Sequence, residues 1–280
     1  MLNYHLVYKY AILLSMTEQS SRKLNWLEQN LPEGLLVDAA WMTRQGYSTA
    51  LRSQYVSAGW LEQPARRVYR RPRGELSWQQ VIISMQILLE KPVWAGGRMA
   101  LDAQGYSHYI SPEGPREIHL YGDKTPPGWL YKLPLKEQFF YHNAKKLFGE
   151  AISTDPLHNS LKQMPWGQWD WPLTFSTPER ALLELLDELP SRESFHQVDV
   201  LVEGLSTLSP RRLQKLLEDC RSVKVKRLFF WFADRHRHAW LNRLDKSRVN
   251  LGKGKRMLVR GGKLDPVYQI TVPEDLYDHK

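Results

Sequence analysis

A short turn between two helix-like segments most constrains how this chain can fold. Apolar residues recur at helical spacing from Leu35 to Met42, and the pattern stops at Gly46, because glycine readily adopts the positive φ that ends a helix. Ser48 follows where a second helix would begin, and its hydroxyl can accept a hydrogen bond from an amide of the first turn. This stretch therefore predicts two helices joined by a tight turn.

The second helix is expected to have an apolar side and a polar side. Leu51, Tyr55 and Ala58 lie at i, i+4 and i+7 and predict one buried stripe. Two apolar pairs farther along, at residues 60–61 and 68–69, flank an arginine-rich loop and predict a hairpin. Helix, turn, helix and hairpin together are the outline of a winged helix-turn-helix.

Polar side chains around this helix and hairpin are candidates for DNA contacts. Hydroxyl and guanidinium groups on a recognition helix reach base edges in the major groove, whereas basic groups on a wing contact phosphate or the minor groove. A solvated arginine face on a purely structural helix-turn-helix is the alternative. The candidates are Ser48, Thr49, Arg52 and Ser53 for the major groove, Arg66 and Arg67 for the wing, Arg44 and Tyr47 for the DNA backbone, and Arg70 and Arg71 as further basic groups.

Composition and charge narrow the class of protein. The 280 residues are 42% hydrophobic and 25% charged, which is typical of a globular protein, and the net charge of +9 favours an acidic partner such as nucleic acid. Cys220 is the one cysteine, so an intrachain disulfide and a cysteine-based zinc site are excluded. The N-terminal apolar stretch lacks the features of a targeting signal and is too short to span a membrane. We expect a cytoplasmic protein without membrane attachment.

The chain is predicted to be α+β, with two domains after an N-terminal extension. Residues 1–15 precede a polar stretch that opens at Met16, and we expect them to be an upstream extension or an extra helix. Residues 16–93 would form the winged helix-turn-helix domain, with a first helix near residues 21–30 and a last one from Ser77. Residues 94–280 would form a larger, mixed α+β domain.

Within the second domain, short β-rich segments are expected first and helices afterwards. Strands are predicted within residues 107–111, 116–122, 128–134 and 137–142, and helices at 98–104, 178–189, 198–205 and 210–219. Trp166, Trp169 and Trp171 predict an irregular segment anchored on the core, or else an aromatic surface for a protein partner.

A second cluster of basic residues lies near the C-terminus, and no catalytic constellation accompanies it. His236 and His238 are two positions apart, so they are expected to face solvent rather than to share a metal. The glycine-rich basic loop lacks the Walker spacing, and the paired carboxylates of a nucleotidyltransferase are missing. We therefore predict neither an enzyme nor a metal or cofactor site. The cluster would bind DNA, bind an acidic protein or be solvated, and comprises Arg235, Arg237, Arg243, Lys253, Lys255 and Arg256.

Several short motifs, taken in order, resemble one known family. These are Gly-Tyr-Ser at 46–48, Tyr-Val-Ser-Ala-Gly-Trp-Leu at 55–61, Val-Tyr-Arg-Arg-Pro at 68–72, Ser-Thr-Pro-Glu-Arg-Ala at 176–181 and Tyr-Gln-Ile-Thr-Val-Pro at 268–273. They are similar to motifs of the AbiEi-type antitoxins, which are transcriptional regulators of type IV toxin–antitoxin systems associated with abortive infection.

The resemblance implies a bacterial protein with two roles. The winged domain would bind inverted repeats in double-stranded DNA upstream of its own operon and repress transcription. The second domain would counter a cognate nucleotidyltransferase-like toxin, without a stable complex being required. The alternative from another class is a protein-interaction module that masks an acidic partner. A nucleic-acid-processing enzyme would need a divalent-metal site.

Overall fold

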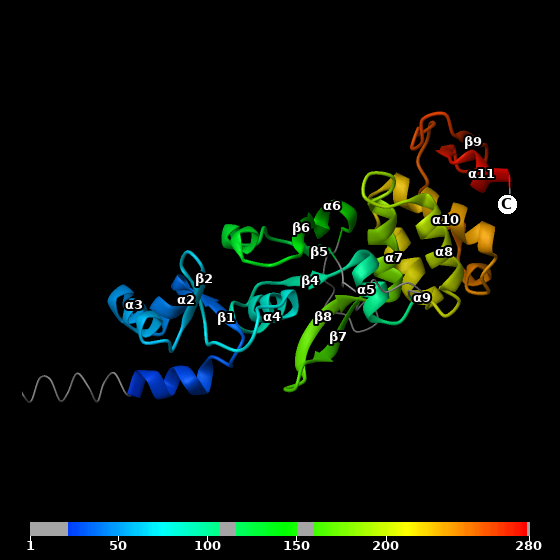
Figure 1. Cartoon of the computed structure of the whole chain (residues 1–280). Coiled ribbons are helices and arrows are strands. Elements are labelled where there is room, and N and C mark those ends of the chain that lie inside the picture. Colours follow the sequence, from blue (N-terminus) through cyan, green and yellow to red (C-terminus); the bar gives the residue numbers. More distant parts are fainter. Residues whose placement is uncertain (1–21, 107–115, 150–159, 279–280) are drawn as a thin grey trace, which may run out of the picture.

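The computed structural model describes residues 22–106, 116–149 and 160–278. Its elements follow one another along an elongated body: an N-terminal module at one end, a central sheet, and a group of helices at the other end (Figure 1). This arrangement confirms a mixed α+β protein. The described residues contain no helix that is long and apolar enough to cross a membrane. The proposed extension and the strand expected at 107–111 lie outside the described residues.

The N-terminal module combines three helices with a small antiparallel sheet. Its strands are ordered β1-β3-β2, and β1 pairs with β3 from Leu36 opposite Arg70 to Asp38 opposite Val68. The elements run as a helix over residues 22–30, β1 (Leu36–Asp38), α2 (Ala39–Arg44), α3 (Thr49–Ser57), β2 (Glu62–Ala65) and β3 (Val68–Arg70).

Local chemistry accounts for the helix boundaries of this module. Asp38 caps α2 by accepting from the amide of Trp41 at 2.8 Å, and Ser48 caps α3 by accepting from Leu51 at 3.2 Å. Gly46 has a φ of +81°, so the predicted turn and cap are confirmed. The helix expected from Leu35 is corrected, because residues 36–38 pair with β3 and form a strand. The neighbouring side chains of Leu36 and Val37 point to opposite faces of this strand, and both are buried.

A long helical segment behind this module connects it to the central sheet. It consists of α4 (Trp78–Ile83) and its continuation as a π-helix, η1 (Ser84–Leu88). Ser77 and Gln80 form a reciprocal capping box at its start, which confirms the predicted helix start at Ser77. Ser84 Oγ accepts from the Leu36 amide at 2.9 Å, whereas Gln86 Oε1 accepts from the Thr174 amide at 3.1 Å.

The central sheet has five strands in the order β6-β5-β4-β8-β7. β4 is antiparallel to β5 and parallel to β8, while β5 and β6 run parallel. The short helices α5 (Gly97–Ala103) and α6 (Ala144–Leu147) follow β4 and β6. The strands are β4 (Val93–Ala95), β5 (Glu117–Gly122), β6 (Gln138–Asn143), β7 (Leu161–Trp166) and β8 (Trp171–Ser176).

Two expectations for this region are corrected. Residues 128–132 form a 3-10 helix, η2 (Gly128–Lys132), instead of a strand, with Leu130 as the buried anchor. The tryptophan-rich segment is a regular β7–β8 hairpin in which Trp166 pairs with Trp171 and their rings stack. Trp169 at the tip is 63% exposed, and Arg73 lies 5.8 Å from its ring centroid.

The helical end of the molecule is built around α10 (Val223–His236). All of its residues from Val225 to Ala233 are buried, so this stretch of the helix is covered on every side rather than amphipathic. α7 (Pro178–Asp187) and α8 (Phe195–Gly204) pack against α10, and α9 (Pro210–Asp219) packs against α7. The bounds of these three helices agree with the prediction to within a few residues. The hydroxyl of Thr177 at the start of α7 makes no cap hydrogen bond.

The C-terminal residues form short elements over this helical group. Arg227 on α10 holds the loop at residues 251–254 by donating to the carbonyl oxygens of Leu251 and Gly254, each 2.7 Å away. Two short antiparallel strands form a hairpin near the C-terminus. The elements are η3 (Leu241–Arg243), η4 (Lys246–Arg248), β9 (Lys263–Asp265), β10 (Ile270–Val272) and α11 (Glu274–Asp278).

Candidate nucleic-acid interface

The exposed side of α3 carries small hydroxyl groups. Ser48, Thr49 and Ser53 are all exposed, while Tyr55 on the opposite side is buried in the core of the module. Arg44 ends α2 and is also exposed, close in sequence to the turn that joins the helices. All four side chains are therefore exposed, and their contact with DNA stays a prediction.

Arg52 is placed differently from the expectation. Its side chain is 6% exposed and turns back onto its own module. The Nη1 atom donates to the carbonyl of Ala39 at 2.8 Å and to Thr43 Oγ1 at 2.9 Å, and Nη2 donates to Thr49 Oγ1 at 2.8 Å. Arg52 therefore joins α3 to α2 and is corrected from a base-reading residue to a positioning residue. Helical periodicity does not reveal these hydrogen bonds, because the acceptors Ala39 and Thr43 belong to a different helix.

Tyr47 is also a core residue instead of a contact with the DNA backbone. Its side chain is 1% exposed, and its hydroxyl donates to the carbonyl of Lys23 at 2.7 Å. Burial, together with the nearby Tyr55, raises the pKa of the Tyr47 phenol to about 12. The ring thus connects the turn to the first helix of the module.

The tip of the β2–β3 hairpin presents two adjacent cations. Arg66 and Arg67 occupy the two positions between β2 and β3 at the tip of the hairpin, and both are exposed. Arg67 has a φ of 67°, a conformation that glycine or asparagine adopts with less strain than arginine. A long cationic side chain is therefore retained at a turn position that does not favour it.

Arg70 and Arg71 are corrected to structural roles. Arg70 Nε donates to Glu62 at 2.6 Å and its Nη2 donates to Gly74 O at 2.7 Å, with only 7% of the side chain exposed. Arg71 Nη1 donates to the carbonyl of Leu31 at 3.1 Å, and Arg71 also pairs with Glu33. The alternation of a strand turns Arg70 inward, so charge count alone overestimates the basic surface.

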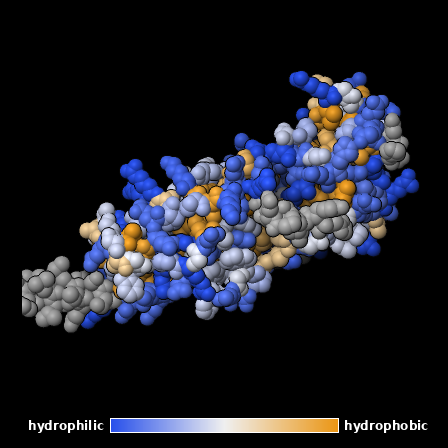
Figure 2. Space-filling model, viewed as in Figure 1, coloured by the Kyte–Doolittle hydropathy of each residue, from blue (hydrophilic) through white to orange (hydrophobic). Residues whose placement is uncertain are grey.

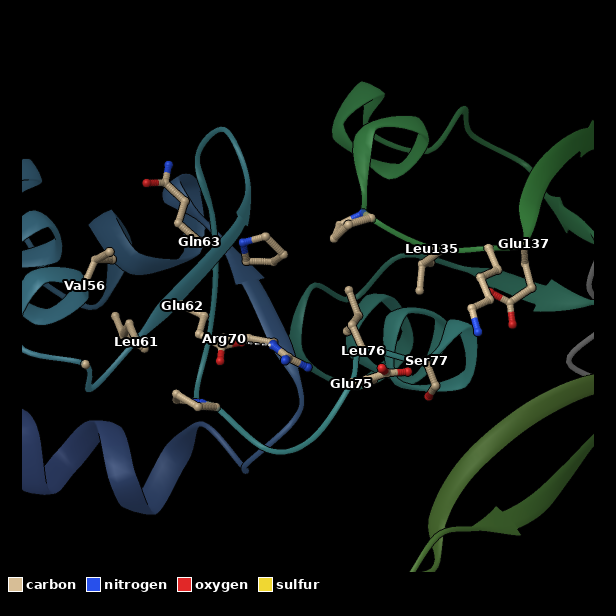
Figure 3. A pocket seen from close by; sticks show the side chains of 15 residues that line it. Val56, Leu61, Glu62, Gln63, Arg70, Glu75, Leu76, Ser77, Leu135 and Glu137 are labelled. Atoms are coloured by element: carbon tan, nitrogen blue, oxygen red, sulfur yellow. Dashed lines mark hydrogen bonds and ion pairs between the residues drawn. The ribbon is translucent and has the colours of Figure 1, made fainter.

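A groove lies between the hairpin and the central part of the molecule (Figure 3). Its volume is about 1000 Å³. Leu61 and Arg70 line it from the N-terminal module, Leu76 from the connection, and Leu135 and Glu137 from the segment after η2. Its lining mixes apolar, basic and acidic groups, so it does not continue the cationic surface of the wing.

The second basic cluster is only partly a surface. Arg235 is corrected: it pairs with Asp199 at 2.9 Å and donates to the carbonyl of Leu276 at 2.6 Å. His236 and His238 are likewise engaged, with Asp199 and with the carbonyl of Val202, instead of solvated. Hydrophilic residues cover most of the face seen in Figure 2, from the N-terminal module to the far helices. The residues of the cluster that remain exposed are Arg237, Arg243, Lys253, Lys255 and Arg256.

A further polar cluster was not predicted. His119 on β5, His142 on β6 and Glu188 at the end of α7 lie together, with one ligand atom of each within 4.8 Å of the others. Burial lowers the pKa of His119, and burial with the neighbouring His119 lowers that of His142 to about 4. Burial raises the pKa of Glu188 to about 7. The three residues are distant in sequence, and the parallel pairing of β5 with β6 and the end of α7 bring them together.

Comparison with known proteins matches the chain to one family along most of its length. Residues 20–112 match the N-terminal domain of the AbiEi antitoxin transcriptional regulators. Residues 115–273 match the transcriptional regulator described as the AbiEi antitoxin of type IV toxin–antitoxin systems. No curated protein matches the chain.

A solved structure supports the fold. The crystal structure of the RV2827C protein from Mycobacterium tuberculosis is similar, with a TM-score of 0.55 and 15% sequence identity over 90% of each chain. At this identity the likeness extends to the fold alone. The family motifs quoted above lie within the matched residues of the two family profiles. The chain therefore belongs to the family of AbiEi antitoxins, the transcriptional regulators of type IV toxin–antitoxin systems.

Proposed function

We propose that the N-terminal module is a winged helix-turn-helix that binds operator DNA and represses its own operon. The observation that carries the proposal is the pairing of an exposed hydroxyl face on α3, formed by Ser48, Thr49 and Ser53, with the Arg66-Arg67 tip. A helix with small polar groups enters the major groove closely, while two cations at the wing contact phosphate or the narrower groove beside it.

The expected operator is an inverted repeat in the promoter of the chain's own operon. Two copies of the protein on a two-fold symmetric site would place each α3 in successive major grooves on one side of the duplex. The second domain would counter a nucleotidyltransferase-like toxin encoded beside this chain, which is the role that membership of a type IV antitoxin family supports. In this proposal the chain itself is a regulator and not an enzyme.

The DNA-binding proposal is tested with the full chain on its own promoter. The double variant Arg66→Gln/Arg67→Asn removes both wing charges, and asparagine tolerates the positive φ at position 67. We expect weaker binding to every DNA sequence and a salt dependence whose log–log slope is smaller by about 2, because two phosphate contacts are lost. Fluorescence anisotropy at several salt concentrations measures both quantities.

A matched variant decides which basic surface meets the DNA. Lys253→Gln/Lys255→Gln removes the same charge from the second basic cluster, where both residues are exposed. Unchanged DNA affinity for this variant, together with weakened binding by the wing variant, supports the proposal. Equal losses for the two variants would show that net charge alone drives binding.

The exposed part of the second cluster favours an alternative role in protein recognition. Five cations remain exposed there, away from the N-terminal module in Figure 1. They would suit the acidic face of a partner, since charge complementarity accelerates and orients association. If Lys253→Gln/Lys255→Gln abolishes protection from the toxin while repression persists, this surface serves the antitoxin role.

A further inference from the structure

Three metal-ligating side chains converge where the outer edge of the central sheet meets the end of α7. His119 and His142 lie on the parallel strands β5 and β6, and Glu188 is the C-cap residue of α7. One ligand atom of each residue lies within 4.8 Å of the other two. Three separate elements thus direct two imidazoles and one carboxylate to one place.

The two imidazoles face each other at hydrogen-bond distance, slightly closer than two ligands of one ion. His119 Nδ1 and His142 Nε2 are 3.0 Å apart. Two nitrogen atoms bound to one tetrahedral Zn²⁺ at about 2.0–2.1 Å are roughly 3.3–3.4 Å apart, so a small outward movement of the rings admits the ion. Tyr121 stacks on the His142 ring at 4.6 Å between centroids and limits how that ring turns.

Carboxylates complete the surroundings of the two histidines. Glu117 Oε2 lies 3.4 Å from His119 Nε2, the nitrogen that does not face His142. A carboxylate on the second nitrogen is the usual partner of a metal-bound histidine, because it fixes the ring and increases its basicity. Glu188 Oε1 is 3.2 Å from His142 Nδ1 and reaches an ion between the rings by turning about its side-chain bonds.

The charge balance at this place also suits a cation. Arg192 lies beside the cluster, 3.7 Å from Glu188 and 4.0 Å from Glu117, and its guanidinium also lies over Phe140. One guanidinium faces two carboxylates, and the neutral imidazole is the form of histidine that binds metals. A divalent ion here meets negative charge and available lone pairs.

We propose that His119, His142 and Glu188 bind one divalent transition-metal ion of the Zn²⁺ class, with Glu117 orienting His119. Two nitrogen donors favour such an ion over Mg²⁺ or Ca²⁺, which prefer oxygen ligands throughout. Three protein ligands leave a further coordination position for water or for a donor from a partner. The ion would tie β5, β6 and α7 together at a site separate from the wing and α3.

The test uses the full-length protein after dialysis against a chelator. Co²⁺ is the probe, because its d–d absorption reports a tetrahedral or five-coordinate site, and Zn²⁺ then displaces it. We expect one equivalent of Co²⁺ to bind and the thermal unfolding midpoint to rise with Zn²⁺ concentration. Absence of stoichiometric Co²⁺ binding overturns the proposal.

Variants assign the ligands. His142→Gln and His119→Gln should each weaken Co²⁺ binding by more than the roughly 10–100-fold that an outer-shell change produces, and Glu117→Gln by about that amount. His196→Gln is the matched control, since His196 is an exposed histidine paired with Asp275 at 2.5 Å. Circular dichroism checks that each variant is folded, and if His142→Gln is not, His119→Gln decides. Equal Co²⁺ affinity of His119→Gln and His196→Gln would refute the site.

Discussion

Arg52 donates a hydrogen bond from its Nη1 atom to the carbonyl oxygen of Ala39, 2.8 Å away. The acceptor is the first residue of α2, and the donor lies in the middle of α3, so one side chain fixes the second helix against the first. The angle between the helices, and with it the presentation of Ser53, depends on a residue that is itself hidden.

Arg52→Ala is expected to lower the free energy of unfolding by about 2–3 kcal/mol. The change removes three hydrogen bonds of a buried cation and leaves the Ala39 carbonyl without that donor, and hydrogen bonds to charged groups each contribute about 1.5–3 kcal/mol. Guanidinium unfolding measures the loss. Ser53→Ala on the exposed side is the control and should remain within about 0.5 kcal/mol of the wild type. Equal stability of the two variants would contradict the role given to Arg52.

Ser53→Ala should affect sequence preference instead. Ser53 is exposed on α3 and carries no charge, so its loss leaves the phosphate contacts intact. We expect the ratio of operator to nonspecific affinity to fall about fivefold, corresponding to roughly 1 kcal/mol for one hydrogen bond, with an unchanged salt slope. Competition between operator and scrambled DNA measures the ratio, and an equal loss of affinity for both DNAs would assign Ser53 to the DNA backbone.

Glu184→Ala should destabilise the second domain by about 3–5 kcal/mol, as expected when one partner of a buried ion pair is removed. Glu184 is fully buried and accepts from Arg180, from Ser176 and from the Gly97 amide. These bonds join α7 to β8 and α5. Thermal and chemical unfolding measure the effect.

The control for Glu184 is an ion pair at the surface. Glu218 pairs with Arg248 at 3.0 Å, and 62% of the Arg248 side chain is exposed. Such pairs contribute about 0–1 kcal/mol, so Glu218→Ala should change stability little. A comparable loss for both variants would indicate that the buried pair has no special structural importance.

Cys220 should react slowly in the native protein. Burial raises the pKa of its thiol from 9.0 to about 11, so at pH 8 the reactive thiolate is roughly 100-fold scarcer than in the unfolded chain. Because the folded pKa is higher than the unfolded one, the thiol contributes stability that is complete below pH 9 and is lost as the pH rises to about 11. A chromogenic disulfide reagent, applied to native and guanidinium-unfolded protein, measures the difference. Equal rates would mean that the thiol is accessible.

The sequence predicts the turn and the hairpin well because their determinants are local. Gly46, the Ser48 cap and the Ser77 cap all act within four residues of themselves, and each is found where expected. The destination of a long cationic side chain is not local. Arg52, Arg70 and Arg71 find carbonyl and carboxylate partners supplied by other elements, so their burial requires the assembled fold.

Nonlocal pairing also explains the remaining differences. Residues 36–38 become a strand only because β3 returns beside them, and the tryptophan-rich segment becomes regular only because β7 and β8 pair with each other. The cluster of His119, His142 and Glu188 depends on the register of two parallel strands and on the end of a helix. Periodicity describes each element and does not specify which elements become neighbours.

Ser84 and Gln86 connect the N-terminal module and the central sheet through the same short helical segment. Ser84 binds the backbone of β1, and two residues later Gln86 binds the backbone of β8, so a single helical turn belongs to both halves. A fragment that stops within residues 84–93 would retain one set of contacts and expose the other. Hybrid regulators that exchange the N-terminal half between family members should therefore keep α4, η1 and their contact residues on β8 together as one unit.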